Sequence, residues 1–409
     1  MSFVLLPIVS FYITPDELGI ATNFTVVTSF VSLIAGLAIV NSLPYFFYEQ
    51  NKKENTLMVS NLLILCVLAC LGLAVLITSI NRLITHYLHL SLSVLLLCVV
   101  YVVGMLITQA SLILMRLENK PHQFACYQVF QIVFHAFAVV LFVMILRGGG
   151  LGKIYAETIV FFVIGFLHLI VLIRKGYIKL HWSNYWIRKL LSFGLPLLPH
   201  SVSFWMKNGV DKVFITTFYG LQFNGLYSMA ISISAIYTML VQSFFNAYTP
   251  YLQKRIVAME GEVDCEKEKQ NIVKQTYQLF GLFGLVGILA VAASWGIFVF
   301  LLDKSYLPAY NYMPPIILAS FIYTFYNFTI QYIYKKKKTL IMGVITLTGS
   351  ILQMLLAYVM IKKIGVMGAA YSLLIGNIII TIGISYYSSK VYRMPWIATL
   401  RSSIPYLSK

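Results

Sequence analysis

The sequence predicts an all-α polytopic membrane protein with about twelve transmembrane helices. Two observations predict this class. The 409 residues are 60% hydrophobic and only 11% charged, whereas soluble globular proteins contain about 25% charged residues. Apolar runs of helical length recur along the whole chain, and the alternating pattern of a membrane β-barrel is absent. No stretch of the sequence is typical of a soluble domain.

The candidate spans follow one another with short connections. The first, residues 1–13, would cover only about 20 Å at the helical rise of ~1.5 Å per residue, against a hydrocarbon core of ~30 Å. It lacks the basic start of a signal peptide, and "ITPDELG" is not a small-residue cleavage site. We therefore expect the true start to lie upstream, with part of the first helix missing. The other spans are 20–47, 56–80, 88–115, 123–146, 154–173, 194–218, 225–248, 275–301, 307–334, 339–361 and 366–389.

Basic residues alternate between the two sides of these spans. Of the 30 Lys and Arg residues, 22 lie in the C-terminal tail or in loops after even-numbered spans, and 6 lie in loops after odd-numbered spans. Because cytoplasmic loops carry the excess of positive charge, both termini are predicted to be cytoplasmic. The net charge of +17 is then explained by topology, and nucleic acid is not an expected partner.

One loop divides the predicted spans into six and six. Residues 175–193 contain "NYWIRKLLSF", which predicts an amphipathic helix at the cytoplasmic membrane surface. We therefore expect an N-terminal lobe over 1–174, a linker over 175–193, a C-terminal lobe over 194–390 and a cytoplasmic tail over 391–409.

The two halves share a trace of repetition. Gly19 precedes the "PY" at 44–45 by the same interval at which Gly225 precedes the "PY" at 250–251, and both pairs are offset by 206 residues. Each pair brackets a span that runs from outside to inside, so the repeat is parallel. Parallel halves related by a pseudo-two-fold axis along the membrane normal are a transporter architecture. A coincidental match is the alternative.

The segment "PHSVSFWMKNGVDKVF", residues 199–214, places three charges between long apolar runs. A charge at a helix centre costs about 2.5–3.5 kcal/mol on insertion scales, so such residues face a bundle interior or water. Lys207 and Asp211 share a helix face and can pair, with Asn208 beside Lys212 on the same turn. Because Pro196 and Pro199 each interrupt or kink a helix, we expect the charges near mid-depth; the alternative places them at the outer end.

Two interpretations of this cluster remain open. In the first, the ion pair fixes helix packing and Lys212 extends outward. In the second, Lys207 and Lys212 form a cationic wall of a central cavity. The excess of positive over negative intramembrane charge favours the second interpretation and an anionic substrate such as phosphate or pyrophosphate.

Other polar residues are weaker candidates. His200 adjoins Pro199 and is placed to face a cavity, while Asn41 and Gln331 are polar residues within apolar spans that could line a path. His135 and His168 are more often packing residues than proton carriers. Most of the 28 tyrosines belong to packing or to the aromatic belts, although some could contact sugars. Cys66, Cys70, Cys98 and Cys126 lie in apolar segments as small core residues, and Cys265 completes the five.

No sequence pattern indicates an enzyme. The chain lacks G-x-S-x-G, H-E-x-x-H and P-loop motifs, and its outer loops are too short for a catalytic loop. No metal site or cofactor is predicted.

Two stretches resemble a known family, the bacterial polysaccharide transporters of the O-antigen flippase type. They belong to the multidrug/oligosaccharidyl-lipid/polysaccharide exporter superfamily. Residues 5–50, "LLPIVSFYITPDELGIA…LPYFFYEQ", are similar to the family's opening, and residues 190–230 are similar to the start of its second half. There an apolar "fglP" leads to a "D-R/K" pair, here Asp211 and Lys212, and then to a "GLYS" element; Lys replaces the commoner Arg.

The resemblance implies two six-helix lobes around a central cavity and alternating access in the bacterial cytoplasmic membrane. It also implies a lipid-linked oligosaccharide as cargo. From the charged cluster we hypothesise an undecaprenyl-pyrophosphate carrier, with Lys207 and Lys212 attracting the pyrophosphate and Asp211 positioning Lys207. Membrane lipids are partners, and glycosyltransferases and a polymerase of the same pathway are possible ones. The alternatives are a multidrug or metabolite antiporter of the same superfamily, and a membrane polymerase or acyltransferase.

Overall fold

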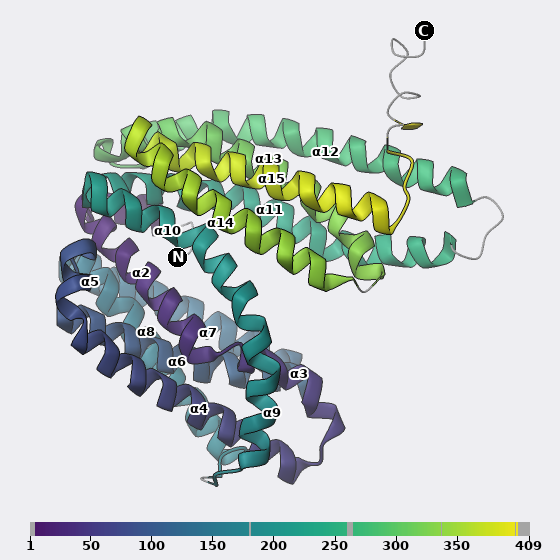
Figure 1. The fold of residues 1–409 in the computed structure, drawn as a ribbon. Coiled ribbons are helices and arrows are strands. Elements are labelled where there is room, and N and C mark those ends of the chain that lie inside the picture. The colour runs from purple at the N-terminus through teal and green to yellow at the C-terminus, as the bar shows by residue number, and fades with distance from the viewer. Residues whose placement is uncertain (1–4, 180, 260–264, 337, 397, 400–409) are drawn as a thin grey trace. The chain divides into compact units, whose positions relative to one another are not determined.

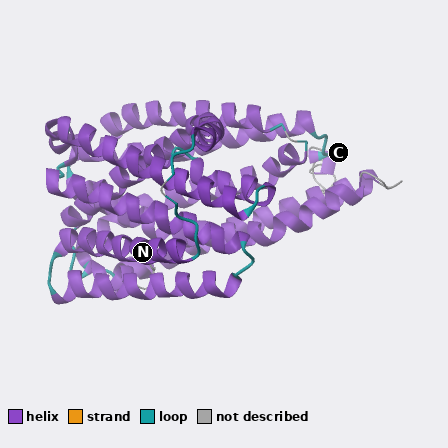
Figure 2. Cartoon of the chain, turned by 90° about the horizontal axis from the view of Figure 1, so that it is seen from below, coloured by secondary structure: helices purple, strands orange, loops and turns teal. Residues whose placement is uncertain are grey.

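Helices form nearly all of the described chain (Figure 2). The computed structural model describes residues 5–179, 181–259, 265–336, 338–396 and 398–399. Over these residues no strand occurs, which confirms the predicted all-α class.

Ten helices in the described ranges are long and apolar enough to cross a membrane, which confirms a multi-pass membrane protein. Two of the twelve predicted spans are not among them. The first contains only α1 (Leu5–Ser10), while residues 1–4 lie outside the described part. The seventh contains α10 (Leu198–Tyr219), whose 22 residues are long enough to cross but include the charged cluster.

Contacts divide the chain into two compact units, Met1–Ser228 and Met229–Lys409. The boundary falls inside α11 (Leu221–Met259), because α10 and the first turns of α11 pack against α2 (Pro15–Gly36). The boundary between the units therefore lies further along the chain than the predicted linker at 175–193, whose role as a boundary between two six-span lobes stays a prediction.

The first unit is built on α2, α4, α6 and α8, which pack alongside one another (Figure 1). Gly104 of α6 and Gly165 of α8 allow two of these helices to cross with backbones in contact, since a Cβ at Gly165 would lie 2.5 Å from the Gly104 Cα. Its further helices are η1 (Ile39–Ser42), α3 (Leu43–Phe46), η2 (Phe47–Glu49), α4 (Lys52–Ser79), α5 (Asn81–Leu88), α6 (Leu92–Leu117), α7 (Pro121–Val139), η3 (Val140–Ile145), α8 (Gly149–Arg174), α9 (Asn184–Gly194) and η4 (Leu195–Leu197).

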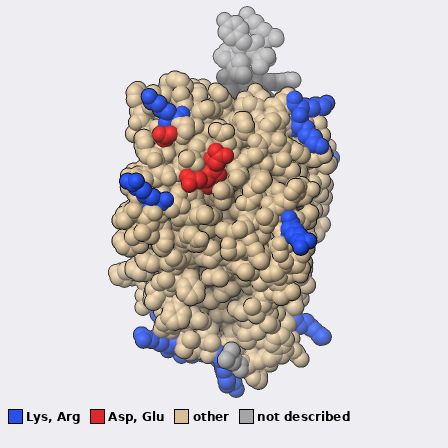
Figure 3. Space-filling model, turned by 90° about the vertical axis from the view of Figure 1, so that its left-hand side faces the viewer, with Lys and Arg blue, Asp and Glu red and all other residues tan. Residues whose placement is uncertain are grey.

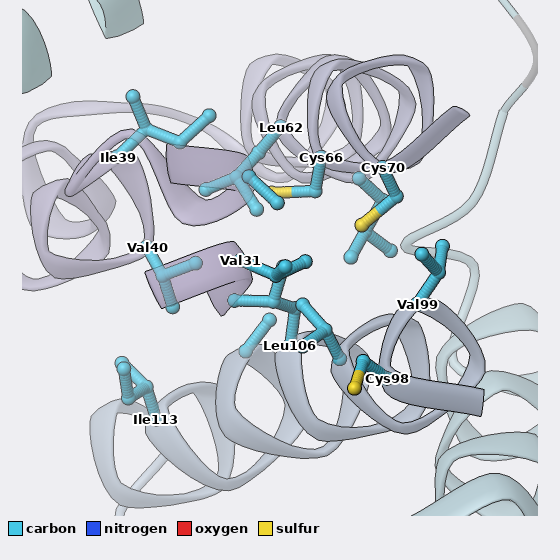
Figure 4. Close-up of a cluster of buried hydrophobic side chains, with 14 of the residues drawn as sticks. Val31, Ile39, Val40, Leu62, Cys66, Cys70, Cys98, Val99, Leu106 and Ile113 are labelled. Carbon is cyan, nitrogen blue, oxygen red and sulfur yellow. The ribbon is translucent and has the colours of Figure 1, made fainter. Parts of the chain in front are cut away.

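An aliphatic cluster between α2, α4 and α6 holds three of the cysteines. Figure 4 shows the sulfur atoms of Cys66, Cys70 and Cys98 among side chains such as Val31. All three thiols are buried and free, as expected for small core residues. For Cys126 that expectation is wrong, because its face of α7 is exposed.

The second predicted span is interrupted, contrary to the expectation of one helix over 20–47. Helix α2 ends at Gly36, and Leu37 and Ala38 both adopt positive φ, 45° and 54°. The backbone at Leu37 lies against Gly194, where a Cβ would come within 2.2 Å of the Leu37 carbonyl oxygen. The break is therefore fixed by packing of the α9 end, which the apolar pattern cannot reveal.

Helix α9 confirms the amphipathic pattern of the linker. Trp186 is fully buried and its Nε1 donates to Glu54 Oε2 of α4 at 2.8 Å, while Tyr185 beside it is exposed. The Lys189 ammonium lies 4.5 Å from the centre of the Phe46 ring.

The crossing of α2 and α11 has a reciprocal geometry. A Cβ at Gly19 would lie 2.2 Å from the Leu221 carbonyl oxygen, and a Cβ at Gly225 would lie 1.8 Å from the Pro15 carbonyl oxygen. The offset of 206 maps Gly19 onto Gly225 and Pro15 onto Leu221, so each contact is the image of the other. A two-fold relation requires such self-complementary contacts, which supports the predicted parallel repeat.

The second unit joins most of α11 to four further long helices. Asn377 Nδ2 of α15 donates to the Ala319 carbonyl of α13 at 2.9 Å, and Ser388 Oγ donates to the Thr329 carbonyl at 2.8 Å. Phe245, Tyr248 and Phe328 belong to a largely aromatic core. Its helices after α11 are α12 (Cys265–Gly296), η5 (Ile297–Leu301), η6 (Lys304–Tyr312), α13 (Met313–Lys335), α14 (Thr339–Ile364) and α15 (Met367–Val391).

Charged side chains are sparse on one face of the molecule (Figure 3). On the face drawn in Figure 3, uncharged residues cover most of the area, and Lys and Arg appear at a few separate places. Such a surface is compatible with lipid rather than water as its solvent.

Candidate functional site

The charged cluster lies in the middle of α10. Pro196 falls within η4 and Pro199 within the first turn of α10, so the chain passes from α9 to α10 through a 3-10 turn. This confirms that the prolines interrupt the helix. Lys207 is then about ten residues, or roughly 15 Å, into a helix of about 33 Å, which favours the mid-depth interpretation.

Asp211 is buried, with 7% of its surface exposed. Its Oδ2 accepts a hydrogen bond of 2.8 Å from the hydroxyl of Tyr227, which is fully buried on α11. Its Oδ1 accepts from the backbone N–H of Lys212 at 2.9 Å. The carboxylate therefore joins α10 to α11. The predicted pairing with Lys207 stays a prediction.

The two lysines of the cluster are both half-buried. The Lys212 ammonium donates to the backbone carbonyl of Asn208, one turn earlier, and the exposed Asn208 side chain donates to the Phe204 carbonyl at 2.8 Å. Asn208 and Lys212 are thus brought together on one face, as their spacing predicts.

A network of buried amides fixes α10 against its neighbours, and sequence analysis missed it. Asn23 Oδ1 of α2 accepts from Thr216 Oγ1 at 3.0 Å and from Asn224 Nδ2 at 2.8 Å, while Asn23 Nδ2 donates to the Leu88 carbonyl at 2.8 Å. Asn23 and Asn224 are fully buried. Asn23 lies inside an apolar span, and this could have predicted the network, because such residues form interhelical hydrogen bonds.

These contacts give the two sequence elements of the resemblance a shared structural role. The "DK" pair supplies Asp211, and "GLYS" supplies Gly225 and Tyr227, with Asn224 directly before it. Asp211 binds Tyr227, Asn224 binds Asn23, and Gly225 permits the close crossing with α2. Together they hold the middle of α10 in one position.

The other predicted site residues lie elsewhere. His200 is exposed in the first turn of α10, and Asn41 is exposed in η1. His168 is buried and bonds Ser111 Oγ at 2.8 Å, consistent with packing. Gln331 belongs to the second unit, on α13. No group of three or more His, Cys, Asp or Glu suited to a metal occurs in the described part of the chain.

The second unit contains a cavity of about 370 Å³ between α11 and α13. All of its described lining residues are uncharged. They are Gln242, Phe245, Asn246, Thr249, Pro250, Tyr326, Asn327, Ile330, Gln331 and Tyr334.

Three comparisons place this geometry among known proteins. A family model described as "Polysaccharide biosynthesis protein" matches residues 1–255. The Lsg locus putative protein 1 of Haemophilus influenzae (strain ATCC 51907 / DSM 11121 / KW20 / Rd) is 25% identical over 152 residues. That alignment covers 37% of this chain and spans about a third, 31%, of the relative's length.

Solved transporters share the fold. An inward-facing multidrug resistance MATE family transporter of the MOP superfamily superposes with a TM-score of 0.70 at 14% identity, covering 99% of this chain and 97% of that one. The lipid II flippase MurJ in an inward closed conformation gives 0.68 at 14% identity, covering 97% and 91%. The family match and the fold agree with the resemblance carried by residues 5–50 and 190–230. The chain belongs to the polysaccharide biosynthesis protein family and has the fold of MOP-superfamily transporters.

Proposed function

We propose that this protein flips an undecaprenyl-pyrophosphate-linked oligosaccharide across the bacterial cytoplasmic membrane, with both termini in the cytoplasm. One observation carries the proposal. The chain belongs to the polysaccharide biosynthesis protein family, and its Lys207, Asp211 and Lys212 lie in the middle of α10, a helix long enough to cross a membrane. Charged residues at that depth mark substrate pathways, and ammonium groups are common ligands of phosphate.

The three charged residues have different roles in this proposal. Asp211 accepts from Tyr227 and so braces α10, while Lys207 and Lys212 supply the positive charge that attracts the pyrophosphate. The Lys212 ammonium holds only a backbone carbonyl of its own helix among its described hydrogen bonds, a contact that it can exchange for a phosphate oxygen. The prenyl tail stays in lipid during the movement.

The test is complementation of a deletion strain, with surface polysaccharide as the readout. Lys207→Ala and Lys212→Ala are each expected to reduce export, and Lys→Arg at the same positions should restore part of it because charge is kept. The exposed Lys304 provides a matched control, since Lys304→Ala removes the same charge outside α10. Normal export by both α10 alanine variants, at normal protein levels, would refute the role of the lysines. Normal export by the deletion strain would refute the function itself.

A further inference from the structure

Two stripes of polar side chains, each with two amides, face the cavity of the second unit. Gln242, Asn246 and Thr249 follow one another on α11 at intervals of four and three residues, and Asn327, Gln331 and Tyr334 repeat the same intervals on α13. Those intervals place each set on one helix face. The structure brings the two faces together across the same cavity.

The α11 stripe remains accessible, and the α13 stripe is held by hydrogen bonds. Gln242 and Asn246 are exposed, with Gln242 Nε2 donating to Asn246 Oδ1 at 3.1 Å. On α13, Gln331 Nε2 donates to the Asn327 carbonyl at 3.2 Å, and its own backbone carbonyl accepts from Gln253. Polar groups at membrane depth persist when they face a water-filled cavity. These amides therefore line an aqueous site rather than a lipid-facing surface.

The lining indicates which ligand fits. An uncharged lining offers no opposite charge to a phosphate or an ammonium group, and its amides are unsuited to a purely apolar molecule. Each amide carries both donors and an acceptor, which matches the mixed donors and acceptors of sugar hydroxyls. Tyr326 and Tyr334 add ring faces and hydroxyls. The volume of about 370 Å³ falls within the ~300–1,000 Å³ range of small-molecule sites.

We infer that this cavity binds the neutral carbohydrate part of the lipid-linked substrate, an assignment that rests on the proposed flippase function. The cavity lies toward the C-terminal ends of α11 and α13, which the charge bias places on the cytoplasmic side. The sugar headgroup thus enters the cavity when the substrate is loaded from the cytoplasmic leaflet.

Binding to the full chain in lipid nanodiscs tests the inference. One probe is undecaprenyl pyrophosphate without sugar, and the other is the lipid-linked oligosaccharide fraction from host cells that lack this gene. The wild-type chain should prefer the second probe. Gln242→Leu and Asn327→Leu should each reduce that preference by about tenfold, because sugar hydroxyls lose a partner, and should leave the affinity for the first probe unchanged. Gln222→Leu makes the same change at an exposed position of α11 outside the cavity and should keep the preference.

The outcomes separate the two proposals. If both cavity variants keep the wild-type preference, the glycan subsite lies elsewhere and the inference is wrong, while the flippase function stands. If the wild-type chain binds neither probe, the function fails and the subsite with it. Thermal unfolding of each variant without ligand checks the fold. Where a leucine variant unfolds early, Gln242→Ala and Asn327→Ala replace it, since alanine suits any helix interior.

Discussion

The close crossing of α2 and α11 predicts that Gly225→Ala destabilises the protein, whereas the same substitution at a glycine outside the crossing stabilises it. In Gly225→Ala the new Cβ would lie 1.8 Å from the Pro15 carbonyl oxygen and 3.1 Å from the Gly19 nitrogen. Both are backbone atoms, so no side-chain rotation relieves the clash. The helices must separate by more than ~1 Å, and such overpacking typically costs about 1–3 kcal/mol. The helix propensity of alanine over glycine offsets only up to about 1 kcal/mol.

Gly281 on α12 is the matched control. A Cβ there meets nothing within 4 Å, so Gly281→Ala should stabilise the protein by up to about 1 kcal/mol. Gly225→Ala should instead destabilise it, by up to about 2 kcal/mol once the propensity gain is subtracted. Gly19→Ala should also destabilise, since its Cβ would lie 2.2 Å from the Leu221 carbonyl oxygen.

The assay is unfolding of the purified chain in mixed micelles, followed by helical circular dichroism. The double variant Gly19→Ala/Gly225→Ala should cost less than the sum of the single variants, because the first Cβ already separates the helices that the second would clash with. Equal shifts of the same sign in Gly225→Ala and Gly281→Ala would refute the close backbone approach. Additive costs in the double variant would show that the two contacts are independent.

Two further predictions concern hydrogen bonds. Tyr227→Phe removes a donor to the buried Asp211 carboxylate and should cost about 1.5–3 kcal/mol in the same assay; an interaction with Asp211→Asn below about 0.5 kcal/mol in a double-mutant cycle would contradict it. Burial opposes ionisation of Glu118, but hydrogen bonds from Lys175 and Lys120 lower its pKa from 4.5 to about 2. Because a carboxyl whose pKa is lowered on folding stabilises only while ionised, its contribution is full above about pH 4.5 and disappears toward pH 2. Glu118→Gln should remove roughly 1 kcal/mol of the stability that is lost on acidification, a figure already lowered for solvent screening. If the variant loses stability in acid as the wild-type chain does, the ion pairs of Glu118 do not contribute in this way.

The sequence by itself determined the membrane class, the approximate course of the spans and the special character of α10. Composition suffices for the class, because a lipid environment excludes charge from every lipid-facing surface. The prolines at 196 and 199 predicted the start of α10, and the one-turn spacing predicted that Asn208 and Lys212 meet. The shared offset of Gly19 and Gly225 indicated a repeat whose two glycines the structure places in one crossing.

Only the tertiary structure decided which helices meet. The break after α2 follows from packing at Gly194, the donor to Asp211 is Tyr227 on the next helix, and the amides of α11 and α13 meet around one cavity. Helical periodicity states which residues share a face, but in a membrane protein both the buried and the lipid-facing sides are apolar. The pattern of apolar residues therefore cannot say which face turns inward, and close helix packing must supply that choice.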